Sequence, residues 1–210
     1  MSEKNFEFEV EPLLYEQIKK PIREITDIVL LIIEVLSYIM WKPVGLQASS
    51  GLKIVISKMR RIFFVFDKKS FSVAMPFYIK QHEDGNLEVY DNNIILDSKI
   101  LSYVKSIITN MDFNNFANVD LDLAIQDEYL SEREKKDARY VFYKLITSEY
   151  GYIRYDDDLI HESGLEHPRY HLDVNYSNGV TFKLALLDKK EYDWLKDLLD
   201  TTTQCKKIVD

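Results

Sequence analysis

Residues 169–187 read RYHLDVNYSNGVTFKLALL, two runs rich in β-branched and aromatic residues on either side of Ser177-Asn178-Gly179. A three-residue hairpin loop needs one residue in the left-handed backbone conformation, and Gly179 suits that position. With this loop, all the cross-strand pairs on one face are apolar. They are Tyr176–Val180, Val174–Phe182, Leu172–Leu184 and Tyr170–Leu186. A loop of two residues would mix apolar and charged side chains on each face, so the pattern predicts the register.

The other face of the same hairpin collects polar side chains. Its pairs are Asn175–Thr181, Asp173–Lys183 and His171–Ala185. Imidazole and carboxylate groups bind metals and transfer protons. The candidate catalytic residues are therefore His171, Asp173 and Lys183.

Three of the four histidines lie within eleven residues, which suggests a mononuclear metal site. The candidate ligands are His161, His167, His171 and Asp173. Successive residues on one face of a strand are about 6.6 Å apart, so His171 and Asp173 can share an ion. His167 lies about 13 Å back along an extended chain and reaches the site only if the chain curls at Pro168. The alternative is that the loop histidines are solvated and that His171 bonds to Asp173 or to a backbone carbonyl.

A nuclease site is a second interpretation of the same face. A strand, a turn and a strand carrying Asp173 and, ten residues later, Lys183 resemble the PD-(D/E)xK nuclease core. That core also needs an acidic residue two positions before the lysine, where this chain has Thr181. The candidates to replace this acid are Glu162, Glu166 and Glu191. The alternative is a cross-strand salt bridge, worth a few tenths of a kcal/mol up to about 1 kcal/mol.

Acid–base catalysis without a metal is also open, with His171 as the base and Asp173 orienting it. No G-x-S-x-G elbow, P-loop, Rossmann glycine run or HExxH sequence occurs in the chain. The run Asp156-Asp157-Asp158 either binds a divalent cation or is a solvated loop, because it lacks the spacing of a calcium loop.

Composition indicates an ordinary globular chain of 210 residues, for which we expect a single α+β domain over 1–210. The net charge of −8 argues against a general affinity for nucleic acid, which requires clustered basic residues. Cys205 is the only cysteine, so no intramolecular disulfide can form. The acidic N-terminus does not resemble a secretory signal, and we expect a cytoplasmic protein.

An apolar run covers residues 28–41 within a helical N-terminal segment, 11–42. We expect a long apolar helix with a kink or restart at Pro21. A bilayer span needs about 20 apolar residues, so the run is too short to cross a membrane. A helix that is apolar on nearly all sides is either the centre of the core or shared with a partner. We therefore expect a protein partner or a homo-oligomer, through the 28–41 helix or an exposed strand edge.

The rest of the chain predicts short helices and hairpins. Runs 61–67 and 70–79 indicate a hairpin turning at Lys68-Lys69, with Pro76 marking an edge strand or bulge. Asp97 is predicted to cap a helix, and Ser131 with Glu134 forms a capping box for another. The sequence LKIVIS fits a helix or a strand. A β-meander followed by a helix is expected over 150–200. The predicted class is α+β, with antiparallel hairpins packed against several helices.

Three short motifs in the C-terminal part carry a resemblance. They are Arg154-Tyr155-Asp156, His167-Pro168 and His171-Leu172-Asp173, followed by a strand and an amphipathic helix. Together they resemble an uncharacterised bacterial family with an RYD…HPxxHL signature, found in mobile and phage-defence loci. The resemblance covers about 50 residues and implies a genomic setting without a mechanism.

The sequence favours a non-enzymatic accessory or interaction subunit of a bacterial multiprotein system, with antiviral defence as the setting that the resemblance implies. No cofactor is expected for that function. The alternative is a metal-dependent phosphoesterase or nuclease that uses the face of His171, Asp173 and Lys183 with a divalent metal ion.

Overall fold

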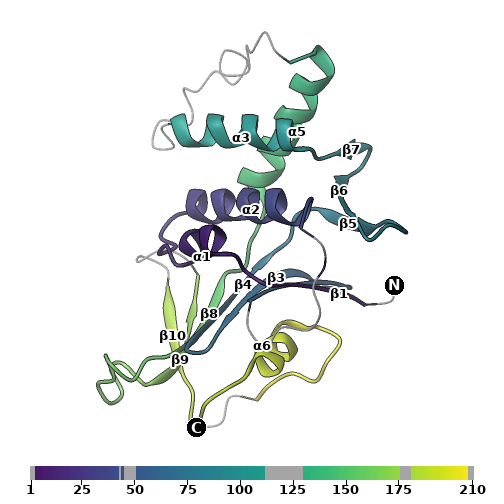
Figure 1. Cartoon of the computed structure of the whole chain (residues 1–210). Helices are drawn as coiled ribbons and strands as arrows, with labels where there is room; N and C mark the ends of the chain where they lie inside the picture. Colours follow the sequence, from purple (N-terminus) through teal and green to yellow (C-terminus); the bar gives the residue numbers. More distant parts are fainter. Residues whose placement is uncertain (1–2, 43, 45–50, 112–129, 176–180, 208–210) are drawn as a thin grey trace. The chain divides into compact units, whose positions relative to one another are not determined.

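The computed structural model describes residues 3–42, 44, 51–111, 130–175 and 181–207. Within these residues, the chain forms two antiparallel sheets and five helices (Figure 1). The predicted α+β class is confirmed.

The larger sheet has seven strands in the order β1-β2-β3-β4-β8-β9-β10. Their bounds are β1 Lys4–Phe8, β2 Gly51–Ile56, β3 Arg60–Phe66, β4 Lys69–Ala74, β8 Ile153–Asp157, β9 Tyr170–Val174 and β10 Phe182–Ala185. The smaller sheet contains β5 Tyr78–Gln81, β6 Leu87–Asp91 and β7 Ile94–Ile95. The helices are α1 Pro12–Ile18, α2 Ile25–Ile39, α3 Ser98–Asn110, α5 Glu132–Thr147 and α6 Tyr192–Leu199.

The chain divides into two compact units. The first contains residues 1–24, 44–75 and 149–210, and therefore holds the larger sheet with α1 and α6. The second contains residues 25–43 and 76–148, with α2, α3, α5 and the smaller sheet. The single domain over 1–210 stays a prediction, which separate expression of the units would test.

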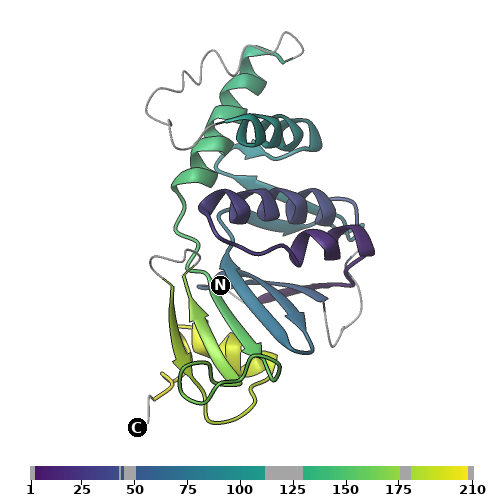
Figure 2. The same ribbon diagram turned by 90° about the vertical axis from the view of Figure 1, so that its left-hand side faces the viewer.

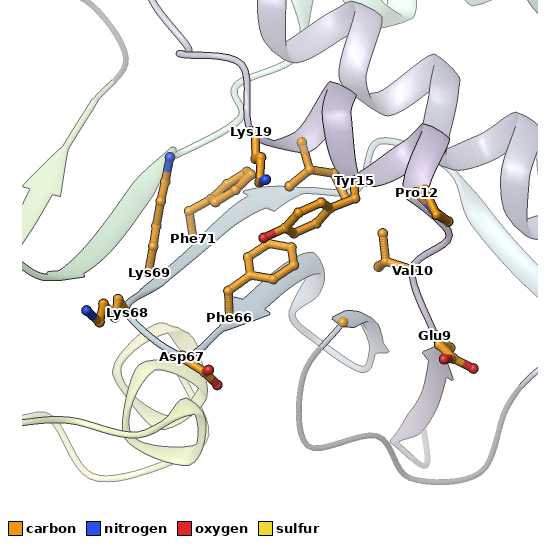
Figure 3. A pocket seen from close by; sticks show the side chains of 12 residues that line it. Glu9, Val10, Pro12, Tyr15, Lys19, Phe66, Asp67, Lys68, Lys69 and Phe71 are labelled. Atoms are coloured by element: carbon orange, nitrogen blue, oxygen red, sulfur yellow. The ribbon is translucent and has the colours of Figure 1, made fainter.

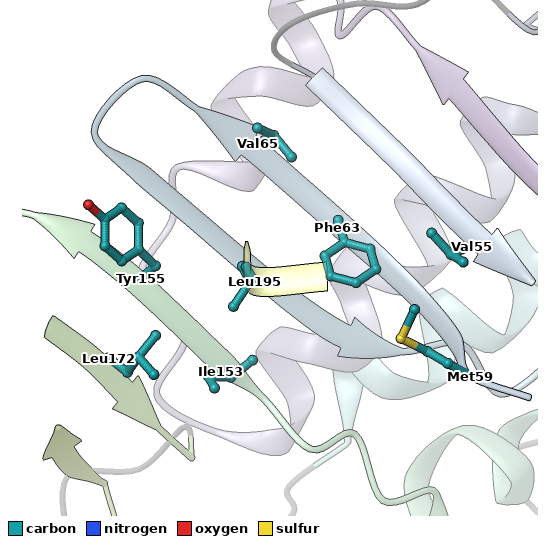
Figure 4. Packing of buried hydrophobic residues seen from close by; sticks show 8 residues of the cluster. All are labelled: Val55, Met59, Phe63, Val65, Ile153, Tyr155, Leu172 and Leu195. Atoms are coloured by element: carbon teal, nitrogen blue, oxygen red, sulfur yellow. The ribbon is translucent and has the colours of Figure 1, made fainter. Parts of the chain in front are cut away.

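The helix α6 packs on one face of the larger sheet, which we call the α6 face (Figure 2). Its hydrophobic cluster joins side chains from four strands to a single leucine of the helix (Figure 4). The buried members are Val55, Met59, Phe63, Val65, Ile153, Tyr155, Leu172 and Leu195. Leu195 is the one buried residue of α6, so it anchors the helix.

The opposite face, which we call the α1 face, is apolar on β3 and β4. The rings of Phe64 and Phe71 stack at 4.4 Å between centroids, and Tyr15 of α1 meets Phe66 edge-on at 5.3 Å. Farther along the same face, on β8 and β9, the side chains become polar. This change from apolar to polar within one face positions the candidate site.

The register predicted for the β9–β10 hairpin is confirmed. Val174 pairs with Phe182, Leu172 with Leu184, Asp173 with Lys183 and His171 with Ala185. The amide of Leu186 also donates to the carbonyl of Tyr170 at 2.9 Å. The predicted pair Tyr176–Val180 and Gly179 lie outside the described residues.

The two predicted β units belong to one sheet, because β4 pairs with β8. In that ladder Lys69 lies opposite Asp156 and Phe71 lies opposite Arg154. The β3–β4 turn is at Asp67-Lys68, since Phe66 pairs with Lys69, one residue earlier than predicted. The run 70–79 is not one strand: β4 ends before Pro76 and β5 joins the smaller sheet.

The prediction of a long apolar N-terminal helix is wrong, while the restart predicted at Pro21 within the helical segment 11–42 is confirmed. The segment contains α1 of 7 residues and α2 of 15 residues, separated around Pro21, where a proline lacks the amide that an unbroken helix needs. The apolar side chains of α2 are nonetheless mostly buried. The ambiguous LKIVIS segment lies in strand β2, and the unexpected strand β1 pairs with it.

The predicted caps of the second unit are confirmed. Asp97 accepts a hydrogen bond from the amide of Ile100 at 2.7 Å, at the start of α3. Ser131 and Glu134 form the reciprocal capping box of α5. No helix in the described part of the chain is both long enough and apolar enough to cross a membrane.

Candidate functional site

The candidate site is a patch of polar side chains on the α1 face of β8 and β9. Arg154 pairs across the strands with Asp173, and Asp156 pairs with His171. Because cross-strand partners project to the same side of a sheet, all four side chains meet there. We call these four residues the polar cluster.

Three members of the polar cluster are arranged as metal ligands. One ligand atom each from Asp156, His171 and Asp173 lies within 4.8 Å of the other two. The Nε2 atom of His171 is 3.5 Å from Oδ2 of Asp156 and 3.9 Å from Oδ1 of Asp173. Ligands bound tetrahedrally at about 2.1 Å from a metal lie roughly 3.4 Å apart. The three side chains therefore need only small shifts to bind one ion.

The orientation of His171 is fixed by the backbone. Its Nδ1 lies 2.8 Å from the carbonyl oxygen of Pro168. A carbonyl can only accept a hydrogen bond, so Nδ1 carries the proton and, in the neutral ring, the Nε2 lone pair points at the two carboxylates. A ring that donates from one nitrogen to a backbone carbonyl while its other nitrogen is free is the usual arrangement of a metal-binding histidine.

Asp173 provides a second observation that favours cation binding at these side chains. Its side chain is only 7% exposed, and its Oδ1 atom is buried without a hydrogen-bond partner. A buried carboxylate oxygen without a partner costs free energy, which a metal ion at that position would recover. The unpartnered Oδ1 faces Nε2 of His171, inside the group of three ligands.

Arg154 holds the two carboxylates together. Its Nε donates to Oδ2 of Asp156 at 2.6 Å, and its other donor bonds to Oδ2 of Asp173. Burial would lower the pKa of Arg154, but Asp156 and Asp173 raise it above its usual value. The guanidinium occupies one oxygen of each carboxylate, which leaves Oδ1 of Asp173 directed at His171.

Two lysines border the polar cluster. Lys183 on β10 lies 4.0 Å from Oδ1 of Asp173, and its side chain is 40% exposed. Lys69 on β4 lies opposite Asp156. Burial lowers the pKa of Lys69, as does the nearby Arg154. Both ammonium groups are placed to meet an anion that approaches the ligands.

The other predicted metal ligands are not in the group of three. The chain does curl at Pro168, and the His167 ring lies 4.8 Å from the His171 ring. However, Nε2 of His167 faces Asp158 at 3.3 Å and its Nδ1 faces Lys183 at 3.2 Å. His161, which is largely exposed, also bonds to Asp158. Burial acts to raise the pKa of Asp158, but its hydrogen bonds with His161 and His167 outweigh burial and lower that pKa to about 2.

The other interpretations of the site change as well. The acid missing at Thr181 is not replaced by Glu162, Glu166 or Glu191, since among the described residues only Asp156 completes the group with His171 and Asp173. Asp173 does not orient His171 through Nδ1, because that nitrogen bonds to Pro168.

Asp156 is the member of this group that the sequence did not connect with His171 and Asp173. It lies in the predicted β-meander and in the RYD motif, and the sequence grouped it with Asp157 and Asp158 as a cation site or a solvated loop. Alternation along the strand could have indicated it, because Ile153 and Tyr155 face the cluster on the α6 face and Asp156 must then face the other way.

No family model, curated protein or solved structure matches this chain. The site therefore has to be interpreted from its own geometry.

Proposed function

We propose that this protein is a divalent-metal-dependent phosphoesterase whose metal ligands are Asp156, His171 and Asp173. The buried Oδ1 of Asp173, which accepts no hydrogen bond from the described residues and faces Nε2 of His171, carries the proposal. Two carboxylates with one imidazole form a mixed oxygen and nitrogen ligand set, which suits Mn²⁺ and Zn²⁺. Three protein ligands leave positions for water and substrate.

A bound divalent ion would lower the pKa of a coordinated water and polarise the phosphoryl group. Hydrolysis then forms one bond from the water oxygen to phosphorus and breaks the ester P–O bond. The leaving oxygen takes up a proton, and no oxidant is needed. Lys183 supplies a positive charge beside Asp173 for a phosphoryl oxygen. His171 binds the metal in this proposal and does not act as a base.

The test is metal binding to the protein after chelation and dialysis, by calorimetric titration with Mn²⁺ and Zn²⁺. We expect one ion per chain, and Asp173→Asn should weaken binding at least about 100-fold because a charged ligand is lost. The control is Asp157→Asn, since Asp157 lies next to the ligand Asp156 but pairs with Arg169. Asp157→Asn should bind Mn²⁺ and Zn²⁺ with affinities within about twofold of the wild-type values.

Activity is measured on bis(p-nitrophenyl) phosphate with and without the metal. We expect turnover that depends on the ion and disappears in Asp173→Asn. Equal metal affinity in the wild type and Asp173→Asn would reject the site. Stoichiometric binding without hydrolysis would reject the phosphoesterase and keep the metal centre.

A second candidate function, an interaction subunit, is supported by β10. This strand is the last in the order of the larger sheet, and all four of its residues are exposed. Phe182 is 50% exposed and Leu184 is 38% exposed. A partner strand can pair with such an edge and cover its apolar side chains. The antiviral setting rests on the sequence resemblance alone.

For that function, we expect a stoichiometric partner in native-salt affinity purification, and Leu184→Lys should reduce its recovery at least about tenfold by placing a charge in the interface. The control is Leu13→Lys, an 81% exposed leucine on α1. Equal losses in both variants would contradict a role for the β10 edge.

A further inference from the structure

A cavity of about 920 Å³ opens on the α1 face, within the first unit (Figure 3). It lies between α1 with the segment before it and the β3–β4 hairpin. Pockets for small molecules commonly measure about 300–1,000 Å³, so this one can hold a whole ligand. None of the residues that line this cavity has a role in the metal site proposed above.

Lys69 connects this cavity to the metal ligands. It lines the cavity and lies opposite Asp156 in the β4–β8 ladder. Directly opposed residues have Cα atoms about 4.5–5.5 Å apart. Lys69 is therefore one strand spacing from Asp156, while His171 and Asp173 lie on β9, the next strand of the sheet.

Lys69 makes no close ion pair in the described part of the chain, although, against burial and Arg154, the charges of Asp156 and Asp173 act to raise its pKa. Among the described residues its ammonium makes no hydrogen bond or ion pair, and it lies 5.5 Å from the centre of the Phe71 ring. The side chain is partly buried, so it has lost part of its hydration. A partly desolvated cation gains more from a bound anion than a fully hydrated one does.

The rest of the lining combines aromatic rings with further charges. Tyr15 and Phe66 are both partly exposed, and their rings meet edge to face. The ammonium of Lys19 lies 4.0 Å from the centre of the Tyr15 ring. Three lysines and two acids line the cavity, which leaves a net positive lining in a chain of net charge −8.

We propose that this cavity binds a nucleoside phosphate, with its phosphate at Lys69 and its base against Tyr15 and Phe66. The inference rests on the proposed phosphoesterase and names its substrate class. A phosphate would pair with the ammonium of Lys69. A planar nucleobase would pack against the rings of Tyr15 and Phe66, as bases do on aromatic side chains. The strongly negative net charge opposes a long polynucleotide, so the ligand is a mononucleotide or the end of a short chain.

The experiment is calorimetric titration of the full chain with adenosine 5′-monophosphate, once in chelator and once in saturating Mn²⁺. Adenosine and inorganic phosphate are the comparison ligands, and each should bind at least about tenfold more weakly because it fills half of the site. Lys69→Gln should weaken nucleotide binding by about tenfold or more, and Tyr15→Leu should weaken it as well. Lys58→Gln, at an exposed position after β2, is the matched control and should bind like the wild type.

Separate measurement of Mn²⁺ binding distinguishes the two proposals. Nucleotide binding in chelator that Lys69→Gln weakens supports the cavity even where no metal binds and the phosphoesterase fails. Metal binding without nucleotide binding overturns the cavity proposal alone. Phosphate that binds as tightly as the nucleotide, or Lys69→Gln that binds like the wild type, also overturns it. Thermal melts of each variant show that a loss is not due to unfolding.

Discussion

Replacing Arg154 with methionine is expected to lower the free energy of unfolding by about 2–4 kcal/mol. Arg154 bonds to Asp156 and to Asp173, whose side chains are 13% and 7% exposed. Removing one partner from a buried ionic network leaves uncompensated charge, which costs about 3–5 kcal/mol when burial is complete. The expected loss of stability is smaller than that range because the Arg154 side chain is 28% exposed. Urea unfolding in the presence of chelator measures the loss.

The same variant should become dependent on divalent ions. Without the guanidinium, the two carboxylates repel each other more strongly, and a bound cation restores the lost positive charge. An ion at about 100 times its dissociation constant stabilises a protein by roughly 2.7 kcal/mol. We therefore expect Mn²⁺ to raise the melting temperature of Arg154→Met more than that of the wild type.

The matched control is Arg169→Met. Arg169 bonds to Asp157 at 2.7 Å, so a second arginine–aspartate pair joins the same two strands outside the metal group. Its loss should destabilise the protein without any dependence on Mn²⁺. An equal response of both variants to Mn²⁺ would contradict a cation site at the polar cluster.

Local sequence signals were sufficient to predict the register of the β9–β10 hairpin. Few residues of the sequence separate the two strands, and apolar and polar side chains alternate on both of them. A slip of one residue would place Lys183 opposite Val174, so a single register separates the faces. This register alone placed His171, Asp173 and Lys183 together.

The pairing of β4 with β8 could not be predicted in this way. Lys69 and Asp156 are 87 positions apart in the sequence, and the whole second unit except α2 lies between them. No turn fixes their register, and alternation within each strand does not identify the neighbouring strand. Lys69 and its cavity were therefore not accessible from the sequence.

The position of Asp156 beside His171 and Asp173 could not be predicted, for a related reason. The connection between β8 and β9 is 12 residues long, from 158 to 169, and a loop of that length does not set a register. The connection contains His161 and His167, which made a stronger sequence signal for a metal site than Asp156 before it. In the structure His161 and His167 bond to Asp158, while the ligand group takes its carboxylates from regular strands.

Replacing Leu195 with alanine is expected to lower the free energy of unfolding by about 3 kcal/mol, within the range of about 2–5 kcal/mol for buried leucines. Leu195 is 1% exposed and is the one buried residue of α6. A helix of eight residues is unstable in isolation, so its order depends on packing against the sheet, where Leu195 is its one fully buried side chain beside the partly buried Tyr192, Trp194, Leu198 and Leu199.

The position of Leu195 separates stability from binding. Its neighbours Ile153 and Leu172 point to the α6 face, while Asp156, His171 and Asp173 project from the same two strands to the opposite face. Leu195→Ala should therefore lose stability in urea and keep the Mn²⁺ affinity of the wild type, whereas Asp173→Asn should lose that affinity. Leu187→Ala is the control, since Leu187 is 93% exposed and should change stability by less than about 0.5 kcal/mol. A Leu195→Ala protein that remains folded but binds Mn²⁺ as poorly as Asp173→Asn would show that the faces are coupled. The expected result separates the stability that Leu195 contributes on the α6 face from Mn²⁺ binding on the opposite face.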